Sequence, residues 1–464
     1  MTSYTRYAII DLPPDTDGKS EEKKKAISMS KHFKAGVARE KITPPLGTLL
    51  YGYPTIRAAE SVHDDLYLTA VALEGHGVRA IMISADICAY GEEEIFPLCK
   101  EISKATGVDE SHITFSCTHT HSAPCTRFSA GWGDKNTDYI NGILNPAAIR
   151  ASVRAVEELT EAQVGYGTVD SLVGVNRRER RLNGSVALGQ CPYGIFNKEM
   201  TVISLRRPSG EGIGCMIHYG AHCTAAGALP VITRDWAGIM VDELERESGM
   251  ICAFFGGPSG DTGPRLSNGK TTGDIALMEE LGALAGRDAV AAYRAISEYA
   301  TPDLKVIADS IHIPYEPLMS CEEARSELGK LLEKAPYERL EGADKKAAKK
   351  YSDVIEHYEK GLPEKREMVY PVTSVSIGDI AFCPFPFEVF GEIAIRIAQH
   401  SPFKKTLVLN NTNGSHAYFP TESEIPLGGY EVFMFGMFQT FTPIKKSDCI
   451  AVNEYLRVLG ALKQ

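Results

Sequence analysis

The sequence predicts a mixed α/β (α+β) fold, built as a single large domain of mixed sheets with surrounding helices. Strand signals alternate irregularly with helical ones along the 464 residues, which indicates a mixed class. The composition, with 44% hydrophobic and 23% charged residues, is that of an ordinary globular protein. No internal repeat and no linker rich in Pro, Gly and Ser divides the chain, so one elaborated domain is expected.

The domain is expected over residues 34–464, after a polar, charge-rich leader at 1–33. Two apolar runs separated by Gly75-His76-Gly77 predict a hairpin whose second strand is buried on both faces. Further strand signals lie at 162–175, 198–206, 213–220, 249–255, 304–313, 370–384 and 405–410. Helical patterns lie at 92–105, 144–159, 236–247 and 273–298.

Residues 321–367 combine apolar positions at helical spacing with many charges, which predicts a helical hairpin inserted on the surface. Its expected role is a cap, an insertion or a subunit contact, and a homo-oligomer is left open.

Charge and composition exclude several function classes. The net charge of −11 and the pI near 5.6 argue against nucleic acids and anionic membranes as partners. No window approaches the roughly 18 apolar residues that membrane insertion requires. The N-terminus lacks the pattern of a secretory signal, and the 11 Cys show no CxxC pair, so we expect a cytoplasmic protein with reduced thiols.

The segment ITFSCTHTHSAP, residues 113–124, carries the sharpest local signal. It begins as a strand and ends at Ser and Pro, so His119 and His121 are expected where a strand gives way to a loop. Residues two apart in an extended segment point to the same face, and both imidazoles then reach one point. Two nitrogen ligands suit zinc, although an HxH pair also occurs as two ordinary structural histidines.

A second segment, IHYGAHCTAAG, places His218 inside a predicted strand and His222 where that strand gives way to small residues. His222 is the better ligand candidate. The structural alternative is that His218 packs in the core and His222 caps the following segment.

Glu388 follows a strongly apolar strand, at the predicted start of a helix, with phenylalanines at 385, 387 and 390. The dipole of a helix N-terminus or simple surface exposure would explain such a carboxylate. Near a cation, the same residue becomes a ligand.

The glycine-rich segment FFGGPSGDTGPR, residues 254–265, follows a short apolar strand. Its backbone amides could face a ligand or an oxyanion. Phosphate binding is the weaker alternative because the GxxxxGK[ST] pattern is absent, and Asp261 could instead fix the turn through its own side chain.

Taken in order, these segments resemble the N-terminal catalytic domain of the neutral, non-lysosomal ceramidases, zinc amidases that cleave the N-acyl bond of ceramide. The resemblance spans roughly residues 34–440. THTHSAP is its one individually specific piece. The others support it by their order: GVAREKITPP, SVHDDLYLTAVAL, ISADI, VNRR, HCT, GDTGP, PFE, and AYFPTESE running on to GGYE.

The resemblance implies one zinc ion per chain, held by His119, His222, Glu388 and Tyr418. The spacing of twelve from Tyr418 to Tyr430 matches the family, and His416 is the substitute ligand. His121 and Tyr430 look like the family's acid-base groups, and Arg177, in its Asn-Arg motif, would hold the carbonyl or an anionic group of the substrate. The loop residues Gly260, Asp261, Thr262 and Gly263 would supply positioning or oxyanion groups.

The chain departs from the family in two respects. Gly263 stands where the family has a Ser, so a serine nucleophile is not implied. The family's C-terminal immunoglobulin-like domain has no counterpart in the 34 residues after Tyr430. With the absent secretory signal, these departures favour a small polar N-acyl compound, such as an acylated amino sugar or amino acid, over ceramide.

The leading hypothesis is a zinc-dependent hydrolase that cleaves a C–N amide (N-acyl) bond of a soluble small molecule by metal-activated water. The nearest alternative uses the same zinc site on an ester or a lactone. An alternative of another class is a catalytically inactive binding or scaffold protein. Manganese or iron could replace zinc, because imidazole and carboxylate suit several divalent ions.

Overall fold

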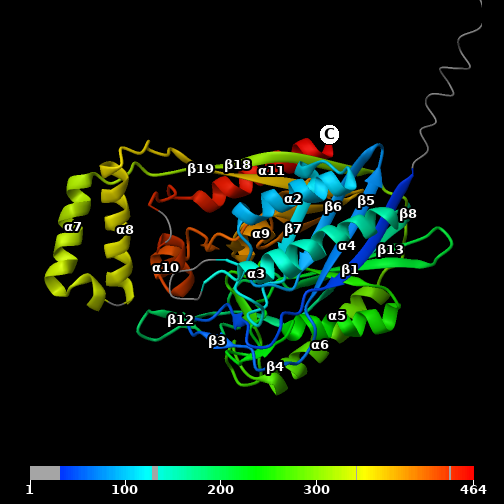
Figure 1. Cartoon of the computed structure of the whole chain (residues 1–464), viewed down its shortest axis with the longest axis horizontal. Helices are drawn as coiled ribbons and strands as arrows, with labels where there is room; N and C mark the ends of the chain where they lie inside the picture. The colour runs from blue at the N-terminus through cyan, green and yellow to red at the C-terminus, as the bar shows by residue number, and fades with distance from the viewer. Residues whose placement is uncertain (1–31, 128–133, 341, 438–439) are drawn as a thin grey trace, which may run out of the picture. The chain divides into compact units, whose positions relative to one another are not determined.

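Three sheets of four or five strands form the framework of a computed structural model, which describes residues 32–127, 134–340, 342–437 and 440–464 (Figure 1). The predicted leader at 1–33 lies outside these residues, except that His32 is described and Phe33 begins the first strand. Residues His32–Gln464 form one compact unit with a mixed α+β fold.

The first sheet has the strand order β7-β6-β5-β1-β8. His76 and Gly77 close the β5–β6 hairpin with φ values of +51° and +80°, the left-handed pair that a type I′ turn requires. The connection from β6 to β7 runs through α2, so these two strands are parallel. Helix α4 packs on β1 and β5. The bounds are β1 (Phe33–Lys41), β5 (Tyr67–Gly75), β6 (Val78–Ala85), β7 (Ile113–Cys117), β8 (Thr160–Glu161), α2 (Glu92–Thr106) and α4 (Asn145–Glu157).

The second sheet has the order β16-β14-β13-β9 and is covered by two long helices that pack on each other, α5 and α6. Trp236, Met240 and Met278 are fully buried between these helices and the sheet. The bounds are β9 (Gln163–Asp170), β13 (Glu199–Arg206), β14 (Gly212–Tyr219), β16 (Cys252–Gly256), α5 (Asp235–Ser248) and α6 (Ile275–Arg294).

The third sheet has the order β18-β19-β20-β22 and is covered by α9 and α11. The single strand expected at 370–384 is two strands, because a turn with Gly378 at φ +61° reverses the chain. Helix α11, which the sequence analysis did not identify, stacks Tyr455 on Phe385 with 4.0 Å between ring centres. The bounds are β18 (Leu304–Pro314), β19 (Glu367–Ile377), β20 (Ile380–Pro384), β22 (Lys405–Leu409), α9 (Gly391–His400) and α11 (Ser447–Lys463).

Between β18 and β19 the chain forms two packed helices, α7 (Cys321–Lys334) and α8 (Gly342–Glu359). Leu331, Leu340 and Ala348 form a small core of their own there. In Figure 1 this yellow hairpin stands beside α10 (Tyr430–Met437), which α8 contacts. The hairpin is thus joined to the segment that carries Tyr430.

The remaining strands of the described residues form two-stranded ribbons. The short elements are β2 (Leu49–Leu50), β3 (Arg57–Ala58), β4 (Ser61–Val62), β10 (Gly174–Asn176), β11 (Arg178–Arg180), β12 (Val186–Leu188), β15 (Val231–Ile232), β17 (Thr262–Pro264), β21 (Glu388–Val389), β23 (Tyr418–Phe419) and α3 (Thr137–Tyr139). None of the helices described combines the length and the apolarity needed to cross a membrane.

The inner faces of the three sheets share one apolar core, to which each contributes large side chains: Val71 and Met82, Ile203 and Phe255, and Phe382 and Leu407. Backbone hydrogen bonds then join the sheets at the carboxyl ends of the edge strands β7, β16 and β22. Cys117 N donates to Asn411 O at 3.1 Å, and Asn410 N donates to Gly256 O at 2.9 Å. Because β14 and β20 run parallel beside β16 and β22, the loops that follow β7, β14 and β20 begin close together.

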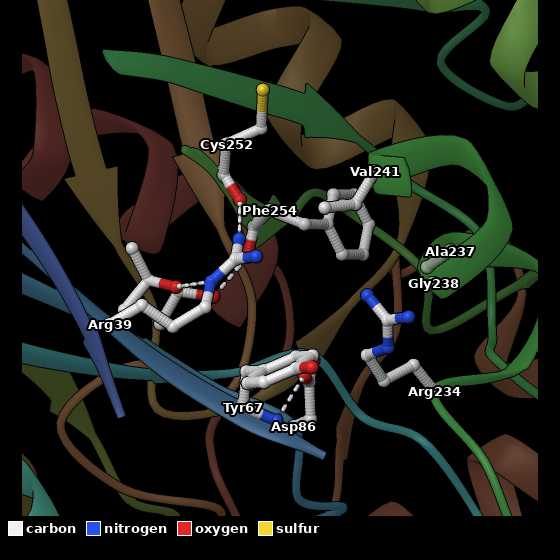
Figure 2. Close-up of a pocket in the computed structure, with 11 residues that line it drawn as sticks. Arg39, Tyr67, Asp86, Arg234, Ala237, Gly238, Val241, Cys252 and Phe254 are labelled. Atoms are coloured by element: carbon white, nitrogen blue, oxygen red, sulfur yellow. Dashed lines mark hydrogen bonds between the residues drawn. The ribbon is translucent and has the colours of Figure 1, made fainter. Parts of the chain in front are cut away.

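A buried ionic cluster ties the first sheet to α5 (Figure 2). The guanidinium carbons of Arg39 and Arg234 lie 5.0 and 5.2 Å from the centre of the Tyr67 ring. Asp86 accepts a hydrogen bond from Tyr67 N at 2.9 Å, and burial raises the pKa of its carboxyl to about 6. These groups line a cavity of about 20 Å³, which has room for one water molecule.

Candidate metal centre

His119 lies two residues beyond the end of β7 and is buried. Its φ of +65° shows that the chain has left the extended conformation. The prediction that His119 and His121 point to one face of an extended segment is therefore wrong. Hydrogen bonding fixes the ring instead, because Nδ1 lies 2.7 Å from the carbonyl oxygen of Cys88. With Nδ1 turned to this carbonyl, Nε2 is the ring atom that faces the centre.

His121 still reaches the same point, with its Nε2 3.2 Å from His119 Nε2. Gly52 and Tyr53 pack against its ring, and Arg57 donates to its carbonyl oxygen at 2.9 Å. Its Nδ1 is buried and has no hydrogen-bond partner among the described residues. Burial is the largest cause that lowers the pKa of His121 well below its usual value, so this ring is neutral.

His222 follows β14 and is fully buried. Its Nδ1 lies 3.1 Å from the carbonyl oxygen of Thr262, and its Nε2 lies 2.8 Å from Oε2 of Glu388. Burial and the charge of Arg177 lower its pKa to about 4, which leaves the imidazole neutral, as a metal ligand must be. His218 lies apart from this centre, in the core, where its Nε2 donates to Val408 O at 2.8 Å.

Glu388 lies in β21, three residues before α9 begins, and not at the start of the helix as expected. Phe385, Phe387 and Phe390 are all buried around it. Burial opposes ionisation of Glu388, but His119 and His222 together hold the pKa of its carboxyl well below the usual value. The carboxylate is therefore ionised in an apolar surrounding, which requires positive charge beside it.

The ligand atoms of His119, His222 and Glu388 all lie within 4.8 Å of one another. The separation of 3.4 Å between His119 Nε2 and Glu388 Oε2 is near the edge of a tetrahedron around zinc, about 3.3 Å for bonds of about 2.0 to 2.1 Å. Cys88, His119 and His121 form a second such group. That group is less suited to a metal, because the nitrogen of His119 nearest the thiol is already bonded to a backbone carbonyl.

Tyr418 is buried and lies beside Glu388, because β21 and β23 pair with these two residues opposite each other. Its ring stacks near that of His222, with 6.4 Å between centres. The side chain of Arg177 is also buried here and donates to the Tyr418 hydroxyl at 3.0 Å. The arginine expected to hold a substrate group is thus bonded within the protein.

Glu431, to which the sequence analysis assigned no role, is 1% exposed and accepts a hydrogen bond from Arg177 Nε at 2.8 Å. The signal for it was weak, since one Glu after Tyr430 in a short helix resembles any other helical carboxylate. Tyr430 itself opens α10 and meets Tyr418 edge to face at 5.7 Å. Burial and the charge of Glu388 raise the pKa of Tyr430 to about 12, so it keeps its proton.

Two amides of the glycine-rich loop are bonded within the protein. Gly260 N donates to Val389 O and Thr262 N donates to Ser259 O, both at 3.0 Å. A Cβ at Gly260 would collide with the carbonyl oxygen of Glu388. These amides therefore pack the loop against Glu388 and are not free to bind an oxyanion.

Asp261 and Gly263 also hold the loop in place. The Asp261 carboxylate accepts from Gly391 N at 2.8 Å and lies 3.3 Å from the Asn176 amide nitrogen. Burial raises its pKa to about 7. Gly263, in β17, pairs with Val175 of β10.

His416, the expected substitute ligand, lies apart from the ligand group. Its ring packs on Phe387 with 5.0 Å between centres, and its Nε2 lies 3.5 Å from Glu92. The structure thus brings His119, His121, His222, Glu388 and Tyr418 together and leaves His416 outside.

Comparisons with known proteins identify the fold. No protein-family model matches the sequence. The chain is 26% identical to neutral ceramidase A of Dictyostelium discoideum over 170 residues, which are 33% of this chain and 23% of that protein. The match therefore spans less than a quarter of the curated relative's length.

Among solved structures, the neutral ceramidase from Pseudomonas aeruginosa superposes with a TM-score of 0.71 and 16% identity, over 93% of this chain and 75% of that one. A ceramidase complexed with C2 gives 0.68 and 16%, over 93% and 76%. The chain therefore has a neutral ceramidase-like fold.

Proposed function

We propose that this protein is a zinc-dependent hydrolase that cleaves the amide bond of a soluble N-acyl small molecule. The observation that carries the proposal is the convergence of ligand atoms from His119, His222 and Glu388 within 4.8 Å. Each comes from a different strand end, so only the folded chain brings them together. Tyr418, beside Glu388, is the proposed fourth ligand.

The donors fit zinc on chemical grounds. Two neutral imidazoles and one carboxylate leave a divalent cation with net positive charge, and both imidazoles direct Nδ1 to a backbone carbonyl, as metal-bound histidines do. A bound cation also offsets the charge of Glu388 among its phenylalanines. Manganese and iron accept the same donors, so the choice of zinc is part of the proposal.

Zinc in such a set lowers the pKa of a coordinated water toward about 7 and polarises a carbonyl oxygen. The protein supplies the proton transfers. Neutral His121 accepts a proton beside the centre, and protonated Tyr430 donates one to the oxyanion or to the leaving nitrogen. Their opposite protonation states at pH 7 suit these opposite roles.

An amide is favoured over an ester or a lactone because the similar proteins are named as ceramidases. The preference for a soluble substrate over ceramide rests on Gly263, which stands at the position of the family's Ser. An inactive binding or scaffold protein is the alternative from another class. Retention of the ligand atoms in one buried cluster argues against it.

The proposed partners are a small-molecule substrate and no nucleic acid, in keeping with the net charge of −11. The oligomeric state can be measured by light scattering. A cytoplasmic location is also proposed. It is supported by the cysteines of the described residues, most of which are buried, as reduced thiols of an intracellular protein commonly are.

The test is an assay of the zinc-loaded chain and of His222→Ala on matched N-acyl and O-acyl forms of an amino sugar and an amino acid, with a short-chain ceramide alongside. Hydrolysis of the amides that His222→Ala abolishes supports the proposal. Faster cleavage of the esters identifies an esterase, and preference for ceramide removes the soluble-substrate part. No turnover by a zinc-loaded chain favours the binding protein.

A further inference from the structure

The carboxylate of Glu431 binds two arginines with its two oxygens. Oε1 accepts from Arg177 Nε and Oε2 accepts from Arg178 Nη1, each at 2.8 Å. All three side chains are at most 7% exposed. With both oxygens bonded, Glu431 has one orientation available, and buried charge-assisted bonds of this kind hold it firmly.

Arg177 connects this carboxylate to the candidate metal centre. Its Nη2 donates to the Tyr418 hydroxyl at 3.0 Å, and its guanidinium lies 5.4 Å from the centre of the Tyr418 ring. Because a guanidinium is planar and rigid, fixing Nε with Glu431 also fixes the direction of Nη2. The position of the Tyr418 hydroxyl therefore depends on Glu431.

The far side of the network ends at the surface. Arg178 also donates to Glu424 Oε2 at 2.8 Å and to Gly428 O at 2.6 Å, and Glu424 is bound by the exposed Arg180. Glu424 thus resembles Glu431 in binding two arginines, but it does not contact Arg177. The chain therefore contains a matched control for Glu431.

We propose that Glu431 is a positioning residue of the metal centre, acting through Arg177 on the hydroxyl of Tyr418. The inference rests on the proposed function for the metal-ligand role of Tyr418. The competing explanation is a structural ion pair that only ties α10 to β10 and β11. Removal of a group that orients a metal ligand costs about 10- to 100-fold in metal affinity or activity, whereas a structural pair changes stability alone.

The experiment compares Glu431→Gln with Glu424→Gln, each in the wild-type and the Tyr418→Phe backgrounds. Zinc affinity is measured by chelator competition, and the absorption spectrum of the cobalt(II) form is recorded. In the wild-type background we expect zinc affinity to fall about 10- to 100-fold and the cobalt spectrum to change for Glu431→Gln only. In Tyr418→Phe the same substitution has no further effect, because residues that act through one another are not additive.

Equal losses in both backgrounds, or equal effects of the two glutamate substitutions, overturn the proposal. Should Glu431→Gln fold poorly, Arg177→Lys breaks the same connection and is expected to give the same coupling with Tyr418→Phe. A crystal structure of the metal-free Glu431→Gln protein tests separately whether Glu431 positions Arg177 against the Tyr418 hydroxyl. If Arg177 still meets the Tyr418 hydroxyl at about 3.0 Å there, the proposal is wrong even where zinc binding itself is established. Wild-type protein that binds no zinc refutes the proposed function instead.

Discussion

The Nε2 atoms of His119 and His121 lie 3.2 Å apart, in rings that meet nearly at right angles. Two such nitrogens cannot both carry a proton at this distance, so one of them presents a lone pair to the other or to a cation. His119 has its Nδ1 proton held by a backbone carbonyl, and Glu388 lies 3.4 Å from its Nε2. The pair therefore suits one metal-bound ring beside one ring that receives a proton.

Removal of either histidine ligand is expected to remove the metal. His119→Ala and His222→Ala should retain less than about a tenth of the zinc bound by the wild type, because the site loses one of its two imidazole donors and then binds weakly. The measurement is plasma mass spectrometry on protein purified without chelator.

His416→Ala is the matched control, since His416 packs on Phe387, next to Glu388, but lies outside the ligand group. It should keep about one zinc per chain. Equal loss in His416→Ala would mean that the ligand group is assigned wrongly.

Chelation is expected to lower the thermal stability of the wild type. A ligand that binds only the folded state stabilises it by RT ln(1 + [L]/Kd), about 4 kcal/mol at a thousandfold excess over Kd. Adding EDTA should therefore lower Tm of the wild type by several degrees, as followed by scanning calorimetry. His222→Ala should show no change in Tm with EDTA. The same change in both proteins would mean that EDTA acts at another site.

The sequence predicted that His119 and His121 lie together, but it described their geometry less well. His119 and His121 were expected to share one face of an extended segment, but the strand ends at Cys117 and His119 has φ +65°. A side-chain period of two says nothing about a left-handed residue, whose conformation is set by the hydrogen bonds of the surrounding loops. The two histidines nevertheless lie close together, in the one loop that follows β7.

Long apolar strands and amphipathic helices were predictable because each carries its own periodicity. Helix α11 was missed, although Tyr455 stacks on Phe385 at the heart of the third sheet's core. Glu431 was missed for a different reason. Its partners Arg177 and Arg178 are more than 250 residues away, and no local pattern reports such a pairing.

Gly52 is expected to be essential for the orientation of His121. An added Cβ at Gly52, which has φ +108°, would lie 2.5 Å from Cγ of His121, so the ring must shift. We expect Gly52→Ala to lower kcat/KM about 100-fold, the cost of a displacement near 1 Å in a catalytic group, while zinc content stays near the wild-type value.

Gly47→Ala is its control. Gly47 has φ +85°, but nothing lies within 4 Å of the added Cβ, so this variant bears the backbone strain of a left-handed residue without the contact. It should lose about 1 kcal/mol of stability and keep its activity. If both variants lose activity alike, backbone strain explains the effect and the contact with His121 does not.

Asp86 is expected to make the protein less stable as the pH rises. Its folded-state pKa, raised by burial to about 6 from 3.8, means that the folded state binds the proton more tightly than the unfolded state. The stabilisation is therefore fully present below about pH 4 and is lost as the pH rises through about 6, up to about 3 kcal/mol in total. Asp86→Asn keeps an acceptor for Tyr67 N and removes this dependence. Its free energy of unfolding relative to the wild type, measured by urea denaturation, should rise between pH 4 and pH 7.

Asp109→Asn is expected to show the opposite dependence of stability on pH. Asp109 accepts hydrogen bonds from Ser111, which lower its pKa below the usual value, so its contribution is present above the unfolded-state pKa and is lost as the pH falls. Asp109→Asn should have a lower free energy of unfolding than the wild type, and this difference should shrink toward pH 3 and stay constant above about pH 5.

Parallel curves of unfolding free energy against pH for the wild type and Asp86→Asn would contradict the Asp86 prediction. They would show that Asp86 ionises normally, with Arg39 and Arg234 fully offsetting its burial beside the small cavity.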